Sequence, residues 1–146
     1  MSPQALHVTV AFLGWREPAD VDPVAAALRE LPLPETPLLT PLRVRALPPR
    51  RTRLFALDLE DEAGRGGSLA AAVSARLEAG GWYEPEDRPW WPHVTLARVR
   101  RGERAAPWPD LPAPPRAPFR AAALTLYRST LRREGAEYDA LARREL

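Results

Sequence analysis

Two short repeats of the same residue types are the part of this chain best suited to chemistry. The chain has two histidines, and His7 is followed by Val-Thr-Val while His93 is followed by Val-Thr-Leu. We call residues 7–10 the first motif and residues 93–96 the second motif. Histidine has an unperturbed pKa of roughly 6.5, so each imidazole can give or accept a proton near neutral pH. A reaction that needs one acid and one base could use the pair directly.

Strand geometry predicts how the motifs present their side chains. Because side chains alternate along a strand, His7 and Thr9 share one face, and His93 and Thr95 likewise share one face. Two such strands related by a pseudo-twofold axis would place two imidazoles and two hydroxyls around a volume that suits a phosphate. The hydroxyls would donate hydrogen bonds to its oxygens, while one histidine takes a proton from water and the other protonates the departing oxygen.

This chemistry requires no metal, and we expect neither a metal nor another cofactor. Two histidines are few ligands for zinc, the motifs contain no Asp or Glu, and the chain has no cysteine. The alternative is that each His-Thr pair serves only packing. The repetition of the same polar pair in two apolar stretches is difficult to explain by packing, so it favours a functional role.

The flanking sequence predicts the elements that position these motifs. The histidines lie in predicted strands over residues 6–13 and 92–99. Strands that follow one another predict an α+β domain with mainly antiparallel sheets and two helices. The further expected strands are a hairpin over 42–47 and 54–59 and strands over 119–130 and 138–146. One expected helix is capped by Asp20 or Asp22, has Pro23 in its first turn and continues over 24–31, and the other runs over 69–79 and is capped by Ser68. The expected irregular segments are the proline-rich loop 32–41, the aromatic loop 82–91, the stretch 100–118 and a turn at 134–136.

Composition is that of one ordinary domain of 146 residues, 45% hydrophobic and 27% charged. No signal peptide and no apolar run of membrane-spanning length is visible, so we expect a cytoplasmic protein. Every basic residue is arginine. A genome that favours arginine codons is one explanation, and the suitability of the guanidinium for phosphate is the other.

The two motifs resemble those of a known family. Residues 6–14 and 92–98 resemble the paired His-x-Thr-x motifs of the two-histidine phosphoesterases, in particular the RNA 2′,3′-cyclic phosphodiesterase family, also called the 2′-5′ RNA ligase family. Residues 124–129, followed by Gly135 and Tyr138, resemble that family's closing strands. The resemblance implies a bilobal α+β fold with the motifs facing each other across a cleft.

The resemblance also implies an activity and roles. The family hydrolyses a 2′,3′-cyclic phosphate at an RNA 3′ end to a 2′-phosphate, and some members join tRNA halves through a 2′-5′ bond. His7 would then be the proton donor to the departing 3′ oxygen, and His93 the proton acceptor that activates water. Thr9 and Thr95 would bind the phosphate. From the residues alone the two motifs are equivalent, so donor and acceptor are not distinguished.

Residues near the second motif are weaker candidates. Arg98 occupies a position where the family commonly has arginine, but strand alternation places it with Val94 rather than with His93. It reaches the cleft only if the strand twists or bulges. Arg100 and Arg101 are expected at a solvated strand end. The aromatic residues Tyr83, Trp90 and Trp91 could stack on a terminal base, although loop-anchoring packing is the favoured interpretation.

The start of the chain departs from the family pattern. Family members begin with a strand and a helix before the first motif, whereas this sequence starts six residues before His7. We therefore expect a single domain over residues 1–146 with two lobes, of which the first is incomplete, and a monomer by default.

Two alternative functions remain open from the sequence. One is an RNA-end binding module with weak catalysis, and the other is a phosphoesterase of the same superfamily that acts on small cyclic nucleotides. The expected partners are RNA 3′ ends, including tRNA fragments, and no membrane. Both enzyme interpretations use the same histidines and threonines, so the motifs do not choose between them.

Overall fold

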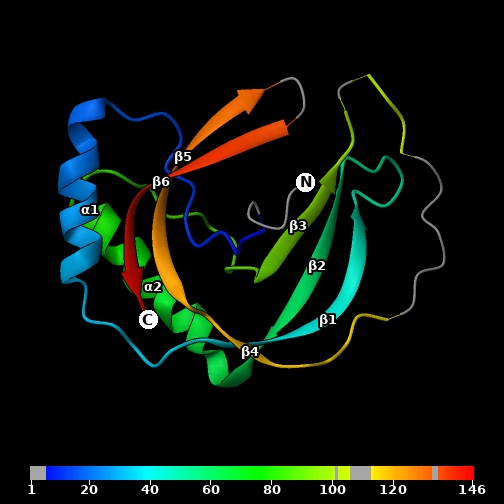
Figure 1. Cartoon of the computed structure of the whole chain (residues 1–146), viewed down its shortest axis with the longest axis horizontal. Coiled ribbons are helices and arrows are strands. Elements are labelled where there is room, and N and C mark those ends of the chain that lie inside the picture. Colours follow the sequence, from blue (N-terminus) through cyan, green and yellow to red (C-terminus); the bar gives the residue numbers. More distant parts are fainter. Residues whose placement is uncertain (1–5, 101, 106–112, 133–134) are drawn as a thin grey trace.

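A computed structural model describes residues 6–100, 102–105, 113–132 and 135–146. In these residues two α-helices accompany two antiparallel sheets (Figure 1), which confirms the predicted α+β class. The larger sheet is curved and has the strand order β3-β2-β1-β4, while β5 and β6 form a separate hairpin. The elements are α1 (Val21–Glu30), α2 (Arg65–Ala79), β1 (Leu38–Leu47), β2 (Leu54–Asp61), β3 (His93–Arg98), β4 (Phe119–Arg120), β5 (Ala123–Arg132) and β6 (Gly135–Glu145). Arg101 and Glu134 lie outside the described residues.

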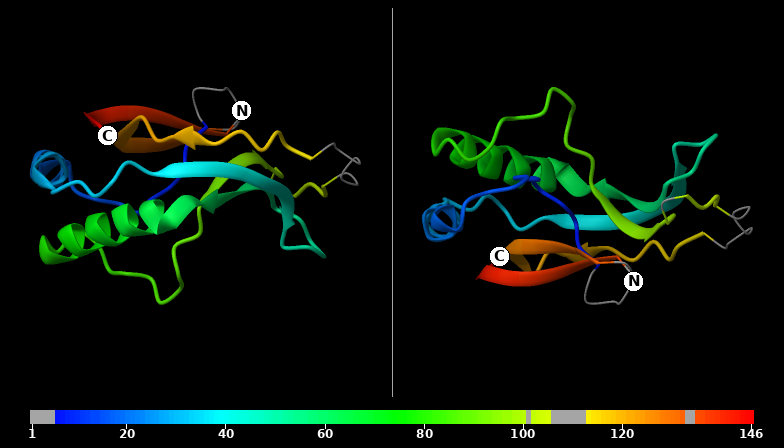
Figure 2. Two further views of the ribbon diagram at one scale, coloured as in Figure 1. Left: turned by 90° about the horizontal axis from the view of Figure 1, so that it is seen from below. Right: turned by 90° about the horizontal axis from the view of Figure 1, so that it is seen from above.

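The main hydrophobic core lies between the two helices and the β5–β6 hairpin. Figure 2 shows α2 and the hairpin on opposite sides of the molecule, with the first described residues passing between them. In α2 the buried residues Leu69, Val73 and Leu77 recur every fourth position, the spacing of one helix face. The buried residues of the cluster are Val24, Leu28, Leu31, Leu69, Val73, Leu77 and Leu124. None of the described helices has the length and apolar character that crossing a membrane would require.

The second helix begins earlier than the sequence predicts. Ser68 is not its cap, because α2 starts at Arg65 after Gly64, whose φ of 67° lies in the left-handed region. The Asp61 carboxylate accepts hydrogen bonds of 2.7 and 2.8 Å from the first free backbone N–H groups, those of Gly66 and Gly67. The last residue of the preceding strand therefore accepts hydrogen bonds from the free N–H groups at the helix start, a role that Ser68 was expected to fill.

The β1–β2 hairpin is confirmed, but β1 is longer than predicted. It begins at Leu38 and runs through Pro41, inside the expected proline-rich loop. The register shifts at Leu42, and β4 pairs only with Leu38 and Leu39. Pro41 therefore lies next to a bulge and beyond the end of β4, where the missing N–H group of proline is tolerated.

The predicted strand over residues 6–13 is wrong. In this segment Val8 forms an isolated bridge and the other described residues belong to no strand. Val10, Ala11 and Leu13 pack against the main core instead. Partial burial against this core explains the apolar character of these three residues, whereas Leu6 and Phe12 are exposed.

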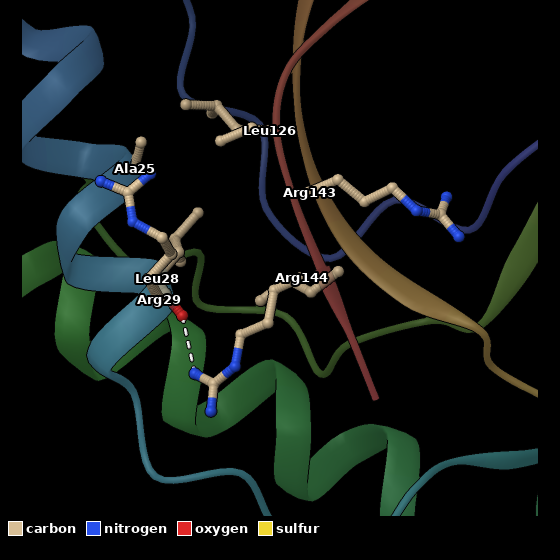
Figure 3. Close-up of a pocket in the computed structure, with 8 residues that line it drawn as sticks. Ala25, Leu28, Arg29, Leu126, Arg143 and Arg144 are labelled. Carbon is tan, nitrogen blue, oxygen red and sulfur yellow. Dashed lines mark hydrogen bonds between the residues drawn. The ribbon is translucent and has the colours of Figure 1, made fainter.

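A pair of hydrogen bonds joins the hairpin to α1. Arg144 of β6 donates to the carbonyls of Leu28 and Leu31, at 2.9 and 2.6 Å, where the last carbonyls of a helix have no partner within the helix. Figure 3 shows the bond to Leu28 beside a small pocket that Ala25, Leu126 and other residues line. Its volume of about 10 Å³ admits no more than a water molecule. Neither motif lines this pocket, so the candidate site lies elsewhere.

Candidate active site

The two motifs meet at a single antiparallel bridge. Val8 pairs with Val94, and Figure 1 shows the segment of the first motif running between β3 and the β5–β6 hairpin. Neighbours of an antiparallel pair are matched in opposite directions along the two strands. The register of the bridge therefore places each histidine beside the threonine of the other motif.

The bridge also assigns the motifs to one face. Side chains directly opposite each other in an antiparallel pair share a face, so Val8 and Val94 face one side and their flanking residues face the other. Thr9 is exposed and the other three flanking residues are partly exposed, so solvent reaches all of them. The residues brought together in this way are His7, Thr9, His93 and Thr95.

Charged residues of β1 and β2 belong to the same face as the second motif. In the strand register, His93 of β3 lies opposite Asp58 of β2, which lies opposite Arg43 of β1. Thr95 and Arg45 occupy the next positions on the same face of the sheet. Asp58 is only 5% exposed, and its Oδ2 lies 3.1 Å from Arg43 Nε and 2.7 Å from Arg45 Nε. Two arginines against one carboxylate leave a positive charge on this face, which favours a phosphate ligand.

The imidazole of His93 is held in two ways by Trp91. The two rings are stacked, with centroids 3.8 Å apart and an interplanar angle of 14°. The Nδ1 atom of His93 lies 2.8 Å from the backbone carbonyl oxygen of Trp91. Because a carbonyl only accepts, Nδ1 carries the hydrogen, and Nε2 of the neutral ring has the free lone pair. This arrangement favours Nε2 as a proton acceptor.

The imidazole of His7 lies in a different aromatic environment, which the hairpin supplies. Tyr138 of β6 meets the ring edge-on, with centroids 4.6 Å apart and an angle of 70°. Tyr127 of β5 lies 5.9 Å away and is tilted by 39°. The two tyrosines also contact each other edge to face at 6.0 Å. The first motif therefore depends on the hairpin for contacts that the second motif obtains from its own loop.

A bulge in β3 brings Arg98 to the face of the second motif. Thr95 pairs with Ala56 and Arg98 pairs with Leu54, so one extra residue of β3, Leu96, falls between the paired positions. Ala56 and Leu54 are two residues apart on β2 and share a face. Arg98 therefore shares the face of Thr95, and the bulge needed for this placement is present.

The aromatic residues of the loop before β3 serve as anchors in the described structure. Trp90 Nε1 donates a 3.0 Å hydrogen bond to the Thr9 carbonyl, and its ring lies so close to Gly66 that a Cβ there would be 2.8 Å away. Tyr83 packs against the main core. Adjacent tryptophans thus contact different motifs, since Trp90 reaches the first and Trp91 the second. These contacts agree with the favoured interpretation of loop-anchoring packing.

Sequence reasoning missed the charged partners of the second motif. The alternation Leu-Arg-Val-Arg in β1 predicts a half-exposed strand and assigns no role to Arg43 or Arg45. The predicted hairpin likewise assigns no role to Asp58. A carboxylate in an otherwise apolar strand, Leu-Phe-Ala-Leu-Asp-Leu, was the available signal, because a buried charge requires a partner.

Solved structures match nearly the whole chain, whereas no protein-family model and no curated protein matches the sequence. TT0787 of Thermus thermophilus is 27% identical, with a TM-score of 0.78 over 100% of this chain and 80% of its own. A phosphoesterase is 25% identical, with a TM-score of 0.74 over 97% of this chain and 76% of its own. Escherichia coli LigT in complex with 3′-AMP is 23% identical, with a TM-score of 0.78 over 99% and 79%.

These matches cover both helices and both sheets, so they concern the whole arrangement and not one shared substructure. The chain therefore has the fold of the two-histidine phosphoesterases of the LigT family, which confirms the resemblance that its motifs indicate.

Proposed function

We propose that this protein hydrolyses a 2′,3′-cyclic phosphate at RNA 3′ ends to a 2′-phosphate. The observation that carries the proposal is the Val8–Val94 bridge, because its register puts two imidazoles and two threonine hydroxyls on one solvent-accessible face. Acid–base catalysis on a phosphodiester needs one proton acceptor and one proton donor around the phosphorus. The paired motifs supply both without a covalent intermediate.

His93 is the proton acceptor in this proposal, and His7 is the donor. The free lone pair on His93 Nε2 takes a proton from water, whose oxygen bonds to phosphorus. The bond from phosphorus to the 3′ oxygen breaks, and protonated His7 gives its proton to that oxygen. The product is a 2′-phosphomonoester beside a 3′ hydroxyl. Proton exchange with solvent then restores both histidines.

Thr9, Thr95 and Arg98 are the proposed phosphate ligands. The two hydroxyls donate to non-bridging oxygens, and the bulge in β3 gives Arg98 access to the same face. The positive charge left by Arg43 and Arg45 around Asp58 adds a favourable field for an anionic substrate. The proposed site therefore combines an acid–base pair at the reacting centre with positive charge around it.

An RNA end is the proposed substrate because of the chemistry of the site and the character of its structural neighbours. One neighbour is a phosphoesterase, and LigT was solved with 3′-AMP, a nucleotide that carries a phosphate on its ribose. A small cyclic nucleotide has the same reacting group. A substrate panel of tRNA fragments, short RNA and cyclic mononucleotides, compared by kcat/KM, separates the two substrate classes.

The test uses a short RNA that ends in a 2′,3′-cyclic phosphate, incubated with the full chain in the presence of EDTA. We expect conversion to a product with a 2′-phosphate and a free 3′ hydroxyl, identified by the added mass of water and by phosphorus NMR. A 3′-phosphate product would contradict the assigned leaving oxygen. Activity that is lost with EDTA and restored by a metal would contradict the metal-independent mechanism, and binding without turnover would support an RNA-end binding module.

A further inference from the structure

Asp58 is a buried acid that the proposed reaction does not use. It is 5% exposed and lies directly opposite His93 in the β2–β3 register. Its Oδ2 pairs with Arg43 and Arg45, and its Oδ1 accepts a 3.1 Å hydrogen bond from Trp91 Nε1. A buried carboxylate destabilises a fold unless it is paired and hydrogen-bonded. Of these partners, Trp91 and Arg45 lead to the surroundings of His93.

Trp91 connects this carboxylate to the imidazole. Its indole N–H is bound by Asp58, its ring is stacked on His93, and its carbonyl accepts the hydrogen of His93 Nδ1. The guanidinium of Arg45 also lies over the indole, 4.9 Å from the ring centroid. The indole is therefore restrained at its N–H edge by Asp58 and over its ring by Arg45. In turn, the stacked indole restrains the plane of the His93 ring, and the Trp91 backbone carbonyl restrains Nδ1.

We propose that Trp91 and Asp58 are positioning residues that hold His93 with Nε2 directed at the substrate. The proposal rests on the function proposed above, in which His93 accepts a proton from water. Without the stack, the imidazole is free to rotate about its side-chain bonds, and Nδ1 can leave the carbonyl. The catalytic lone pair then no longer has a fixed nitrogen or a fixed direction. A displacement of about 1 Å at a reacting atom can lower the rate by about 100-fold.

The variants separate the stack on His93, the hydrogen bond from the indole to Asp58, and the charge of Asp58. Trp91→Leu removes the stack and the indole N–H, whereas Trp91→Phe keeps an aromatic ring but removes the bond to Asp58. Asp58→Asn keeps an oxygen that accepts from the indole but removes the charge that pairs with the arginines. Trp15→Leu is the control, because Trp15 is 77% exposed and lies outside the proposed site. Circular dichroism verifies the fold of each variant.

The first readout is turnover of the RNA with a 2′,3′-cyclic phosphate. We expect Trp91→Leu to lower kcat by about 100-fold, and Trp91→Phe by about 10-fold, with KM changed by less than about twofold in both. Asp58→Asn should have a smaller effect than either, since the indole keeps its acceptor. A loss that appeared in KM alone, or a Trp91→Leu variant with the kcat of the control, would overturn the proposal. If Trp91→Leu does not fold, the kcat of Trp91→Phe is the deciding measurement, and a value equal to that of the control would overturn the proposal.

The second readout does not depend on turnover. Nitrogen-15 NMR of the histidine side chains reports which ring nitrogen carries the hydrogen, and we expect one tautomer for His93, with Nδ1 protonated, in the unmodified protein and in the Trp15→Leu control. In Trp91→Leu, exchange between tautomers should average the two nitrogen signals. An unchanged His93 spectrum would overturn the positioning role. A protein without cyclic phosphodiesterase activity but with this spectral change would instead contradict only the function on which the proposal rests.

Discussion

The first and second motifs have the same residue types but very different structural support. The second lies in β3, which pairs with β2 along its length, and its imidazole is stacked on Trp91 and bound to a backbone carbonyl. The first is joined to β3 by one bridge, and its imidazole contacts Tyr138 and Tyr127 from the hairpin. Surroundings of different kinds can give two copies of one residue different roles. The difference in support therefore distinguishes two histidines that are equivalent in the sequence.

Replacement of either histidine should have the largest effect. We expect His7→Ala and His93→Ala each to lower kcat by about 10²- to 10⁴-fold, because each removes one proton transfer of the same transition state. The kcat of the double variant should be close to that of the less active single variant, since the effects of residues that act as a unit are not additive. Single-turnover kinetics on the RNA with a 2′,3′-cyclic phosphate measures all of these values. Full activity in either single variant would contradict the mechanism.

A modified substrate then separates the roles of the two motifs. A cyclic phosphate with sulfur in place of the 3′ oxygen has a leaving group that departs without a proton. It should restore most of the activity of the variant that lacks the donor, His7→Ala, and little of that of His93→Ala. The reverse pattern would exchange the two assignments, and equal restoration would show that the different surroundings do not produce different roles.

The threonines should have a smaller and more equal effect. We expect Thr9→Val and Thr95→Val each to lower kcat/KM by about 10- to 100-fold, which corresponds to the loss of a hydrogen bond to a charged group. Thr130→Val, a strand threonine of β5 outside the proposed site, is the matched control and should be unchanged. A large loss in only one motif would mean that the phosphate contacts the two motifs unequally.

The smallest effect concerns the attachment of the first motif. Trp90→Phe removes the hydrogen bond to the Thr9 carbonyl and should lower the free energy of unfolding by about 1 kcal/mol. Amide hydrogen exchange should be faster in residues 8–13 than in residues 93–98 of the unmodified protein, because the first segment has one bridge. The substitution should widen this difference, while Trp15→Phe should not. Equal exchange in the two segments would contradict the contrast between the motifs.

The parts of the fold that depend on local pattern were predictable, and the parts that depend on distant partners were not. The α2 face and the β1–β2 hairpin follow from apolar spacing and turn residues, so both appear near their predicted positions. The start of α2 depends on Asp61, which caps the helix from the preceding strand. Residues 6–13 have the composition of a strand, but they form one isolated bridge, and Val10, Ala11 and Leu13 pack against the main core instead of pairing in a sheet.

The same division holds for the candidate site. Repetition and strand alternation select His7, Thr9, His93 and Thr95 in the sequence, and the Val8–Val94 bridge joins the two motifs in the structure. The stacking of Trp91 on His93 was not predictable, because alternation alone does not indicate which ring a loop side chain will meet. Nor was the ion pair of Asp58 with Arg43 predicted, since it depends on the β1–β2 register, which the pattern of each strand alone does not reveal.

The extra residue in β3 changes which later residues of the strand share a face with Thr95 of the second motif. Arg98 follows Thr95 by three residues, a spacing that a regular strand would place on opposite sides and that the insertion of Leu96 places on the same side. A regular strand reaches the same arrangement with a spacing of two. In proteins of this fold, an arginine after the second motif is thus equivalent to Arg98 when its spacing is three with a bulge or two without one. Alignment of the arginines by letter alone would equate side chains that lie on opposite sides of the sheet.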